Sequence, residues 1–321
     1  MPTPVVVVHG GVRVSAPRRE DPEADEEAVN KLRWIAQSAY RAMEAGGSAL
    51  DAVELAVRLM EDDPRFNAGY GSALNLLGEV EVDASIMDGY RMRAGAVGGV
   101  KGVRHAVSLA RAVMERTPHV LLVGEGARDF ARKLGLGGNE DLVYETRVEY
   151  RRRMLEALKS GRGPERLKSL LDLLPLYGVA DTVGAVAVDS EGRLAAATST
   201  GGLTLKLPGR VGDSAIIGAG TYASRAAACS GTGIGEAAML VLGAYRVVKE
   251  VEEGKSPQEA VEDVLLEIHK TTGYAFGFIS VGADGGIGVA QTGYGLFWAA
   301  SGGGWVDGGV KKERPKGLLV T

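Results

Sequence analysis

Apolar residues recur at strand-like and helix-like intervals in separate stretches of the chain. A valine-rich run over residues 4–9 predicts a first strand. Residues 32–43 then carry apolar side chains at helical spacing, and the pair Gly46-Gly47 predicts the end of that helix. Ser48 and Asp51 have the spacing of a capping box and predict a second helix that runs to about residue 60. Two successive helices of this kind should lie on one face of a sheet.

The pattern continues on both sides of residue 182. Before it, residues 79–87 alternate as a strand that is polar on one side, and helix, strand and helix are predicted for 107–115, 119–123 and 127–134. After it, the strands 182–189 and 194–200 form a predicted hairpin. Helices are predicted for 235–251 and 257–271, and the chain closes with predicted strands at 277–281, 287–291 and 295–300. Helix pairs that bracket two runs of strands predict the α+β class and a four-layer αββα arrangement, which we expect to be a single domain over residues 1–321.

Composition narrows the class of protein. With 321 residues and 45% hydrophobic content, the chain can bury a large core, and no apolar run is long enough to predict a membrane span. We expect no signal peptide, because a strand pattern begins at once without a basic segment before it. The single cysteine, Cys229, is expected to be a packing residue and indicates a reducing, cytoplasmic environment. A net charge of −4 disfavours a nucleic-acid binder, and scarce asparagine and glutamine favour a heat-loving source.

One segment is rich in arginine and lysine. Eight arginine and lysine side chains fall within about residues 142–181, together with the sequence Gly161-Arg162-Gly163-Pro164. A basic run of this kind suggests either a nucleic-acid patch or a solvated helical linker, and the acidic overall balance favours the linker.

Thr182 stands before a run of small and β-branched residues, at the start of a predicted buried strand. A threonine hydroxyl is a weak nucleophile and needs a base nearby. His9, His105, His119 and His269 give no pattern of a Ser-His-Asp triad. If the chain is cut between Asp181 and Thr182, the freed α-amino group, with a pKa of about 7.7 to 8.0, supplies a base on the same residue.

Several blocks, in order, resemble one known family. The sequences at 5–11, 64–72, 182–189, 195–202, 207–214 and 230–236 resemble the plant-type asparaginase and isoaspartyl aminopeptidase family of N-terminal nucleophile hydrolases. The resemblance runs from the first predicted strand to about residue 293 and implies the four-layer αββα fold of that superfamily.

The resemblance also implies self-cleavage. It predicts an α subunit of residues 1–181, ending in a mobile basic linker over about 142–181, and a β subunit of residues 182–321. Asp181, Thr182 and Gly10 are the residues we expect to take part in the cut. Thr182 would be the nucleophile, Thr200 would tune its hydroxyl, and Thr232 with Gly233 would form the oxyanion hole.

A binding site for a free amino acid needs a cation for the carboxylate and an anion for the ammonium. Arg210 and Asp213 supply both charges, as the matching family residues do. The alternative to this binding role is that the two residues form only an exposed ion pair in a turn. Gly235 is expected beside them. Asn67 matches an asparagine that orders the nucleophile region or the substrate, although an asparagine beside glycine is also typical of a turn.

The segment before and after Asn67 resembles the sodium-binding loop of the family. The resemblance implies backbone carbonyl ligands, and hard cations favour such oxygens. The residues expected there are Met60, Glu61, Asp63, Phe66, Ala68 and Tyr70. No cofactor is expected for catalysis, and no cluster of histidine and cysteine predicts a zinc site.

The resemblance predicts an enzyme that hydrolyses L-asparagine to aspartate and ammonia and cleaves β-aspartyl dipeptides, as a dimer of cleaved αβ units without nucleic-acid or membrane partners. Asp181 leaves a glycosylasparaginase-like activity open, because many plant-type members carry glycine before the nucleophile. A different class is a dinucleotide-binding module, suggested by the G-x-G-x-x-A sequence from Gly218 to Ala223. That fingerprint is weak, since no convincing acidic residue follows about 20 residues later.

Overall fold

The valine-rich strand near the N-terminus is buried on both of its faces. In the computed structural model, which describes residues 3–14, 21–160 and 182–318, this strand is β1 (Val5–Val12). Val6 and Val8 pack into a core under helices, whereas Val5 and Val7 pack into a second core shared with another sheet. Because successive side chains of a strand point to opposite faces, burial on both faces produces an unbroken apolar run.

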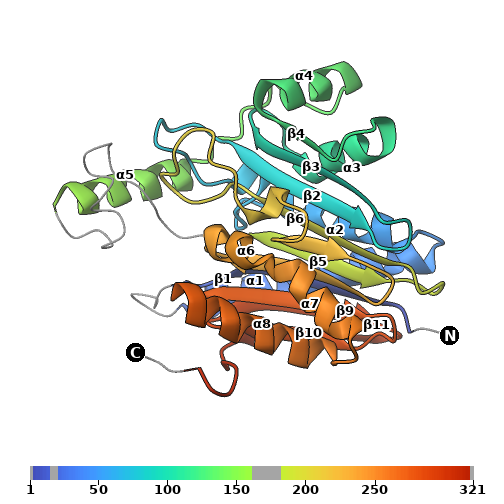
Figure 1. Ribbon diagram of the computed structural model, residues 1–321. Coiled ribbons are helices and arrows are strands. Elements are labelled where there is room, and N and C mark those ends of the chain that lie inside the picture. The colour runs from blue at the N-terminus through green and yellow to red at the C-terminus, as the bar shows by residue number, and fades with distance from the viewer. Residues whose placement is uncertain (1–2, 15–20, 161–181, 319–321) are drawn as a thin grey trace.

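β1 lies in a sheet of eight strands (Figure 1). Neighbouring strands are antiparallel, except that β3 and β4 are parallel. In the order in which they lie side by side, the strands are β12 (Trp305–Lys311), β11 (Leu296–Gly302), β1, β5 (Val183–Val188), β6 (Leu194–Thr200), β2 (Val82–Asp88), β3 (Arg93–Val100) and β4 (Leu121–Val123).

A second sheet of four antiparallel strands packs on the first. Its strands, in spatial order, are β10 (Ile287–Gln291), β9 (Phe276–Gly282), β8 (Ala227–Gly233) and β7 (Thr221–Ala223). Ile279 and Val281 of β9 share a core with Val186 and Val188 of β5. The two sheets therefore form the two inner layers.

Helices cover the outer face of each sheet, on opposite sides of the stack in Figure 1. The larger sheet is covered by α1 (Pro22–Glu44), α2 (Ala49–Glu61) and α3 (Ala106–Arg116), and the smaller by α7 (Gly243–Glu252) and α8 (Pro257–Thr272). The other helices are α4 (Gly124–Leu134), α5 (Glu145–Lys159), α6 (Gly235–Val241) and the short η1 (Gly69–Gly71) and η3 (Asp213–Ala215). The predicted four-layer αββα fold is confirmed.

Two local predictions differ from the structure. The single helix predicted over 235–251 is divided into α6 and α7 at Leu242, which has a positive φ of 55°. A Cβ on the next residue, Gly243, would lie 2.7 Å from Phe278 Cζ, so the chain turns there to pack closely on the sheet. The strands β3, β7, β8 and β12 were not predicted. In β2, the side predicted to be polar is buried together with the apolar side.

The described part of the basic segment is largely helix α5, which extends away from the sheets in Figure 1. Arg147 Nε donates to the carbonyl of Gly71 at 2.7 Å, and Arg151 Nε donates to the carbonyl of Asn75 at 3.1 Å. These bonds attach α5 to the loop between η1 and β2. Residues 161–181, which include the predicted cleavage residue Asp181, lie outside the described residues.

No helix in the described ranges is both long enough and apolar enough to cross a bilayer.

Candidate active site

Thr182 lies at the point where the two sheets meet. It directly precedes β5, and only 3% of its surface is exposed. Its hydroxyl lies 3.3 Å from the hydroxyl of Thr200, the last residue of β6, and its nitrogen lies 3.3 Å from Thr232 Oγ1 on β8. Strands of both sheets thus bring together three threonines that are far apart in the sequence.

Asn67 supports the turn that follows Thr200. Its side-chain Nδ2 donates to the backbone carbonyl of Gly202 at 2.8 Å, and the backbone carbonyl of Asn67 accepts from Gly201 N at 2.9 Å. Gly202 N in turn donates to Thr200 Oγ1 at 3.0 Å. Asn67 therefore orders the residues beside the hydroxyl pair, which is one of the two roles expected for it, although the site roles themselves stay predictions.

Thr232 and Gly233 lie at the end of β8, next to Thr182. Gly233 has a φ of 146°, and a Cβ there would come within 2.6 Å of Phe276 Cδ2 and 2.7 Å of the carbonyl of Ala275. A side chain does not fit at this position without displacing β9. The hydroxyl of Thr232 and the N–H of Gly233 are neighbours in the chain, and oxyanion donors have to converge on one point in space.

Arg210 and Asp213 lie on either side of Gly235. A Cβ on Gly235 would lie 2.4 Å from Asp213 Oδ1 and 3.0 Å from an Arg210 terminal nitrogen. Arg210 donates from Nε and a terminal nitrogen to both carboxylate oxygens of Glu236, at 3.0 and 2.8 Å. The absence of a side chain at Gly235 leaves room beside the partly buried cation and the buried anion, and the guanidinium already holds a carboxylate in a bidentate pair.

The carboxyl of Asp213 is unusual because it is buried and Oδ2 has no hydrogen-bond partner among the described residues. Burial raises the pKa of Asp213 to about 7, against the opposing effect of the nearby Arg210 charge. Burial lowers the pKa of Arg210, but the hydrogen bonds with Glu236 and the charges of Glu236, Asp83 and Asp213 together raise it above its usual value, so the guanidinium stays charged. Strong perturbation by desolvation and by a specific charge is typical of functional sites.

His9 lies between the sheets but is unsuited to act as the base. Its Nε2 lies 3.0 Å from Ser230 Oγ, and burial lowers the pKa of His9 to about 3. Cys229 is buried and free, and burial raises the pKa of its thiol, in agreement with the packing role expected for it. Gly10 lies in an irregular part of β1, where a Cβ would come within 2.7 Å of Phe66 Cε1.

The expected sodium loop has oxygens that suit a hard cation. The carbonyls of Glu61 and Arg104 converge on Gly69, at 2.3 and 2.7 Å from the place where a Cβ would be. Glu61 is buried, and no residue in the described ranges forms a hydrogen bond with its Oε2. Among the described residues no three carboxylate, histidine or cysteine side chains form a metal cluster.

The dinucleotide-binding alternative is wrong. That fingerprint requires a helix after the glycines, so that the helix N-terminus faces the pyrophosphate. Here Gly220 leads directly into β7, an edge strand of an antiparallel sheet, and Gly218 N bonds back to the carbonyl of Thr221.

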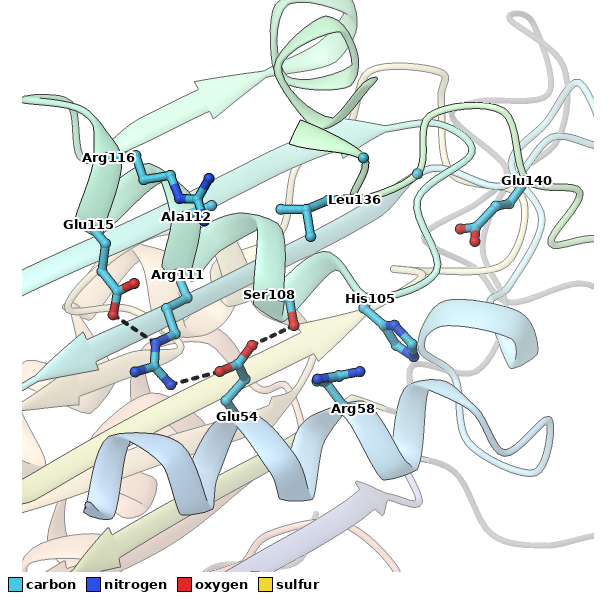
Figure 2. A pocket seen from close by; sticks show the side chains of 12 residues that line it. Glu54, Arg58, His105, Ser108, Arg111, Ala112, Glu115, Arg116, Leu136 and Glu140 are labelled. Atoms are coloured by element: carbon cyan, nitrogen blue, oxygen red, sulfur yellow. Dashed lines mark hydrogen bonds and ion pairs between the residues drawn. The ribbon is translucent and has the colours of Figure 1, made fainter. Parts of the chain in front are cut away.

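A surface cleft of about 480 Å³ between α2, α3 and the loop after α4 lies elsewhere (Figure 2). Arg111 in this cleft pairs with Glu54 and Glu115, and Ser108 also donates to Glu54. None of its lining residues is a predicted site residue. The charges that line it largely neutralise one another, so the cleft is a weaker candidate for the active site than the region around Thr182.

Glu236 is the site residue that sequence reasoning missed. It lies in the block 230–236, directly after Gly235, but it was given no role. The only signal was a carboxylate beside a glycine, and nothing in the linear sequence indicates that it would pair with a residue 26 positions earlier.

Known proteins resemble this chain over nearly its full length. A family model described as Asparaginase matches residues 2–307. The chain is 42% identical to an isoaspartyl peptidase of Salmonella typhimurium, over 92% of this chain and 94% of the relative. It is also 42% identical to an isoaspartyl peptidase/L-asparaginase of Xenopus laevis, over 92% of each, and to a plant-type L-asparaginase of Pyrococcus furiosus, over 89% and 92%.

These matches confirm the resemblance that the sequence blocks indicated and the assignment to a class of hydrolases. The chain belongs to the asparaginase family.

Proposed function

We propose that this protein is a self-cleaving threonine hydrolase that acts on L-asparagine and β-aspartyl dipeptides. The observation that carries the proposal is the position of Thr182, with its hydroxyl beside Thr200 and its nitrogen beside Thr232. The relatives' names, isoaspartyl peptidase and L-asparaginase, support the two kinds of substrate.

Cleavage between Asp181 and Thr182 gives subunits of residues 1–181 and 182–321. The new N-terminal amine of Thr182 then lies at the nitrogen that now faces Thr232 Oγ1 at 3.3 Å. With a pKa of about 7.7 to 8.0, a useful fraction of such an amine is neutral near pH 7.5. The amine accepts the proton of the Thr182 hydroxyl, and no histidine is required.

The Thr182 oxygen attacks the side-chain carbonyl carbon of the substrate, and the carbonyl oxygen becomes an oxyanion. Thr232 Oγ1 and the N–H of Gly233 stabilise that charge. The protonated amine gives its proton to the leaving nitrogen, which departs as ammonia or as the amine of the second amino acid. Water then hydrolyses the threonine ester and releases aspartate.

The two charges beside Gly235 select the α-groups of the substrate. The guanidinium of Arg210 binds the α-carboxylate, and Asp213, whose Oδ2 has no partner in the described part of the chain, accepts from the α-ammonium. A bound ammonium also relieves the cost of an ionised carboxylate in a buried position.

Three further features are part of the proposal. The mature form is a dimer of cleaved αβ units, and the cytoplasm suits a chain with one buried thiol. A sodium ion bound by the carbonyls of Met60, Glu61, Asp63, Phe66, Ala68 and Tyr70 would stabilise the loop that carries Asn67. Catalysis itself needs no cofactor.

Intact mass spectrometry after incubation tests the cleavage. The wild-type chain should give two fragments that meet between Asp181 and Thr182, and Thr182→Ala should remain one chain. Loss of the nucleophile should also lower hydrolysis of a β-aspartyl dipeptide by at least about 10⁴-fold. Thr272→Ala, which removes a hydroxyl bonded within α8, is the matched control and should behave as wild type.

A cut at another bond, or equal cutting of Thr182→Ala, would contradict the mechanism. A glycosylated asparagine should be assayed beside the β-aspartyl dipeptide. Clear preference for the glycosylated substrate would replace the proposed substrate class with the glycosylasparaginase-like one.

A further inference from the structure

The backbone on both sides of Arg210 is bound by two buried carboxylates that the mechanism above does not use. Gly209 N donates to both oxygens of Glu81, at 3.2 and 3.1 Å. Gly212 N donates to Asp83 Oδ2 at 3.0 Å. Glu81 and Asp83 are 4% and 0% exposed, and the hydrogen bond from Gly212 to Asp83 is buried, so water does not compete for that bond.

Asp83 is placed for this contact by an irregularity in the sheet. In the pairing of β2 with β3 the register shifts at Asp83, where Gly98 and Gly99 form a bulge. Gly99 has a φ of 60° and turns its N–H onto Asp83 Oδ1 at 2.8 Å. A Cβ on Gly98 would lie 2.9 Å from Val211, so this glycine also makes room for the loop of Arg210.

A buried lysine accompanies the two carboxylates. Lys206 has no exposed surface, and its Nζ donates to the backbone carbonyl of Glu81 at 2.8 Å. Burial lowers the pKa of Lys206, while the charges of Asp83 and Glu81 oppose that shift. The lysine is a counter-charge for the pair, because two buried anions without a cation would be costly.

From these contacts we propose that Glu81 and Asp83 are positioning residues that hold the loop of Arg210 at the place where its guanidinium meets the α-carboxylate of the substrate. The inference rests on the proposed function, in which Arg210 binds that group. Neither carboxylate need touch the substrate. They fix the two ends of a four-residue segment, 209–212, whose centre carries the guanidinium.

Asp83 also lies opposite Thr200 in the pairing of β2 with β6. A purely structural role for Asp83 would therefore disturb the hydroxyl pair and the self-cleavage as well. A role in positioning Arg210 has a different signature, since it changes substrate affinity and leaves the nucleophile intact. Cleavage and kcat report on the nucleophile, and KM reports on the loop.

Asp83→Asn is the first test. The amide keeps one acceptor but turns an N–H₂ toward the other backbone N–H, so the bond to Gly212 or to Gly99 is lost. We expect complete self-cleavage, a kcat within about twofold of wild type, and about a tenfold rise in KM for a β-aspartyl dipeptide, the effect of losing one charge-assisted hydrogen bond. The Ki of L-aspartate, which carries the same α-groups, should rise by the same factor.

Glu81→Gln is the second test, and it decides the question if Asp83→Asn does not fold. Glutamine keeps an acceptor for Gly209 N, so KM should rise only about threefold. Asp88→Asn is the matched control, because Asp88 is buried at the far end of the same strand and also accepts from two backbone N–H groups, those of Tyr90 and Arg91, at 3.0 Å. It should leave KM and Ki unchanged.

Two results overturn the proposal. One is a wild-type KM and Ki in both Asp83→Asn and Glu81→Gln. The other is a loss of cleavage and kcat that matches or exceeds the change in KM. If instead the wild-type protein fails to hydrolyse β-aspartyl dipeptides, the proposed function itself is wrong. Failure of the proposed function is thus distinguishable from failure of the positioning proposal.

Discussion

The nucleophile end of the site and the Arg210 end are built from different kinds of groups. Around Thr182 the described neighbours are neutral: they include the hydroxyls of Thr200 and Thr232, the backbone of Gly202, and His9, whose pKa is lowered by burial to about 3. Around Arg210 they are charged, with Glu236 on the guanidinium, Asp213 beside it, and two buried carboxylates behind its loop.

This difference separates chemistry from recognition. An amine that serves as its own base must lose its proton near neutral pH, and a nearby carboxylate would hold that proton more tightly. Recognition of a zwitterion needs fixed charges of both signs, which are strongest where water is excluded. Under the proposed mechanism, the protein therefore keeps the charges at one end of the substrate and the reacting bond at the other.

Removing a neutral hydroxyl from the nucleophile end should lower the rate more than a substitution at the Arg210 end does. Thr232→Val keeps the shape but deletes the oxyanion donor, so we expect kcat for the β-aspartyl dipeptide to fall about 10²- to 10³-fold with little change in KM. Steady-state kinetics on the cleaved fraction measures this. Ser280→Ala, which removes a buried hydroxyl farther along the same sheet, should change kcat by less than about twofold because it lies away from the reacting atoms. An unchanged kcat in Thr232→Val would contradict the assignment of the chemistry to the nucleophile end.

Much of the fold and the nucleophile end could be predicted from the sequence. Val5 to Val8 and the strand after Thr182 are continuous apolar runs, and the Ser48–Asp51 capping box is present as predicted. These are local signals, in which neighbouring residues alone determine the element. Family motifs added the order of Thr182, Thr200 and Thr232, which no periodicity contains.

The charged end could be predicted only in part. Arg210 and Asp213 stand close in the sequence and matched a motif, whereas Glu81 and Asp83 looked like the polar side of an ordinary strand. Their partners, Gly209 and Gly212, are 128 and 129 residues away, and they meet through sheet pairing and a bulge. Polar side chains buried by tertiary contacts leave no pattern in the chain that distinguishes them from exposed ones.

At the charged end, a change of geometry at constant charge should affect binding. Arg210→Lys keeps the positive charge but loses the planar pair of donors that now holds Glu236. KM for the β-aspartyl dipeptide should therefore rise about 30-fold, with kcat reduced by less than about threefold. Arg193→Lys is the control, because Arg193 holds Asp189 at the turn between β5 and β6 and should not alter KM. An effect on kcat larger than that on KM would mean that Arg210 belongs to the chemistry after all.

The smallest effect is a dependence of binding on pH, and it isolates one charge. The pKa of Asp213 is raised to about 7, so in the free enzyme the carboxylate that accepts the α-ammonium is progressively protonated as the pH falls below 7. The ionised form binds, and with this pKa its fraction falls about fivefold between pH 7 and pH 6, so calorimetric titration should show the affinity for L-aspartate decreasing by about that factor over this interval. The product tests this better than a substrate does, because its binding does not require the neutral amine of Thr182. Asp213→Asn should bind weakly at every pH and lose the dependence. If that variant kept the wild-type profile, the titrating charge would lie at the nucleophile end, and the separation of neutral and charged regions would fail.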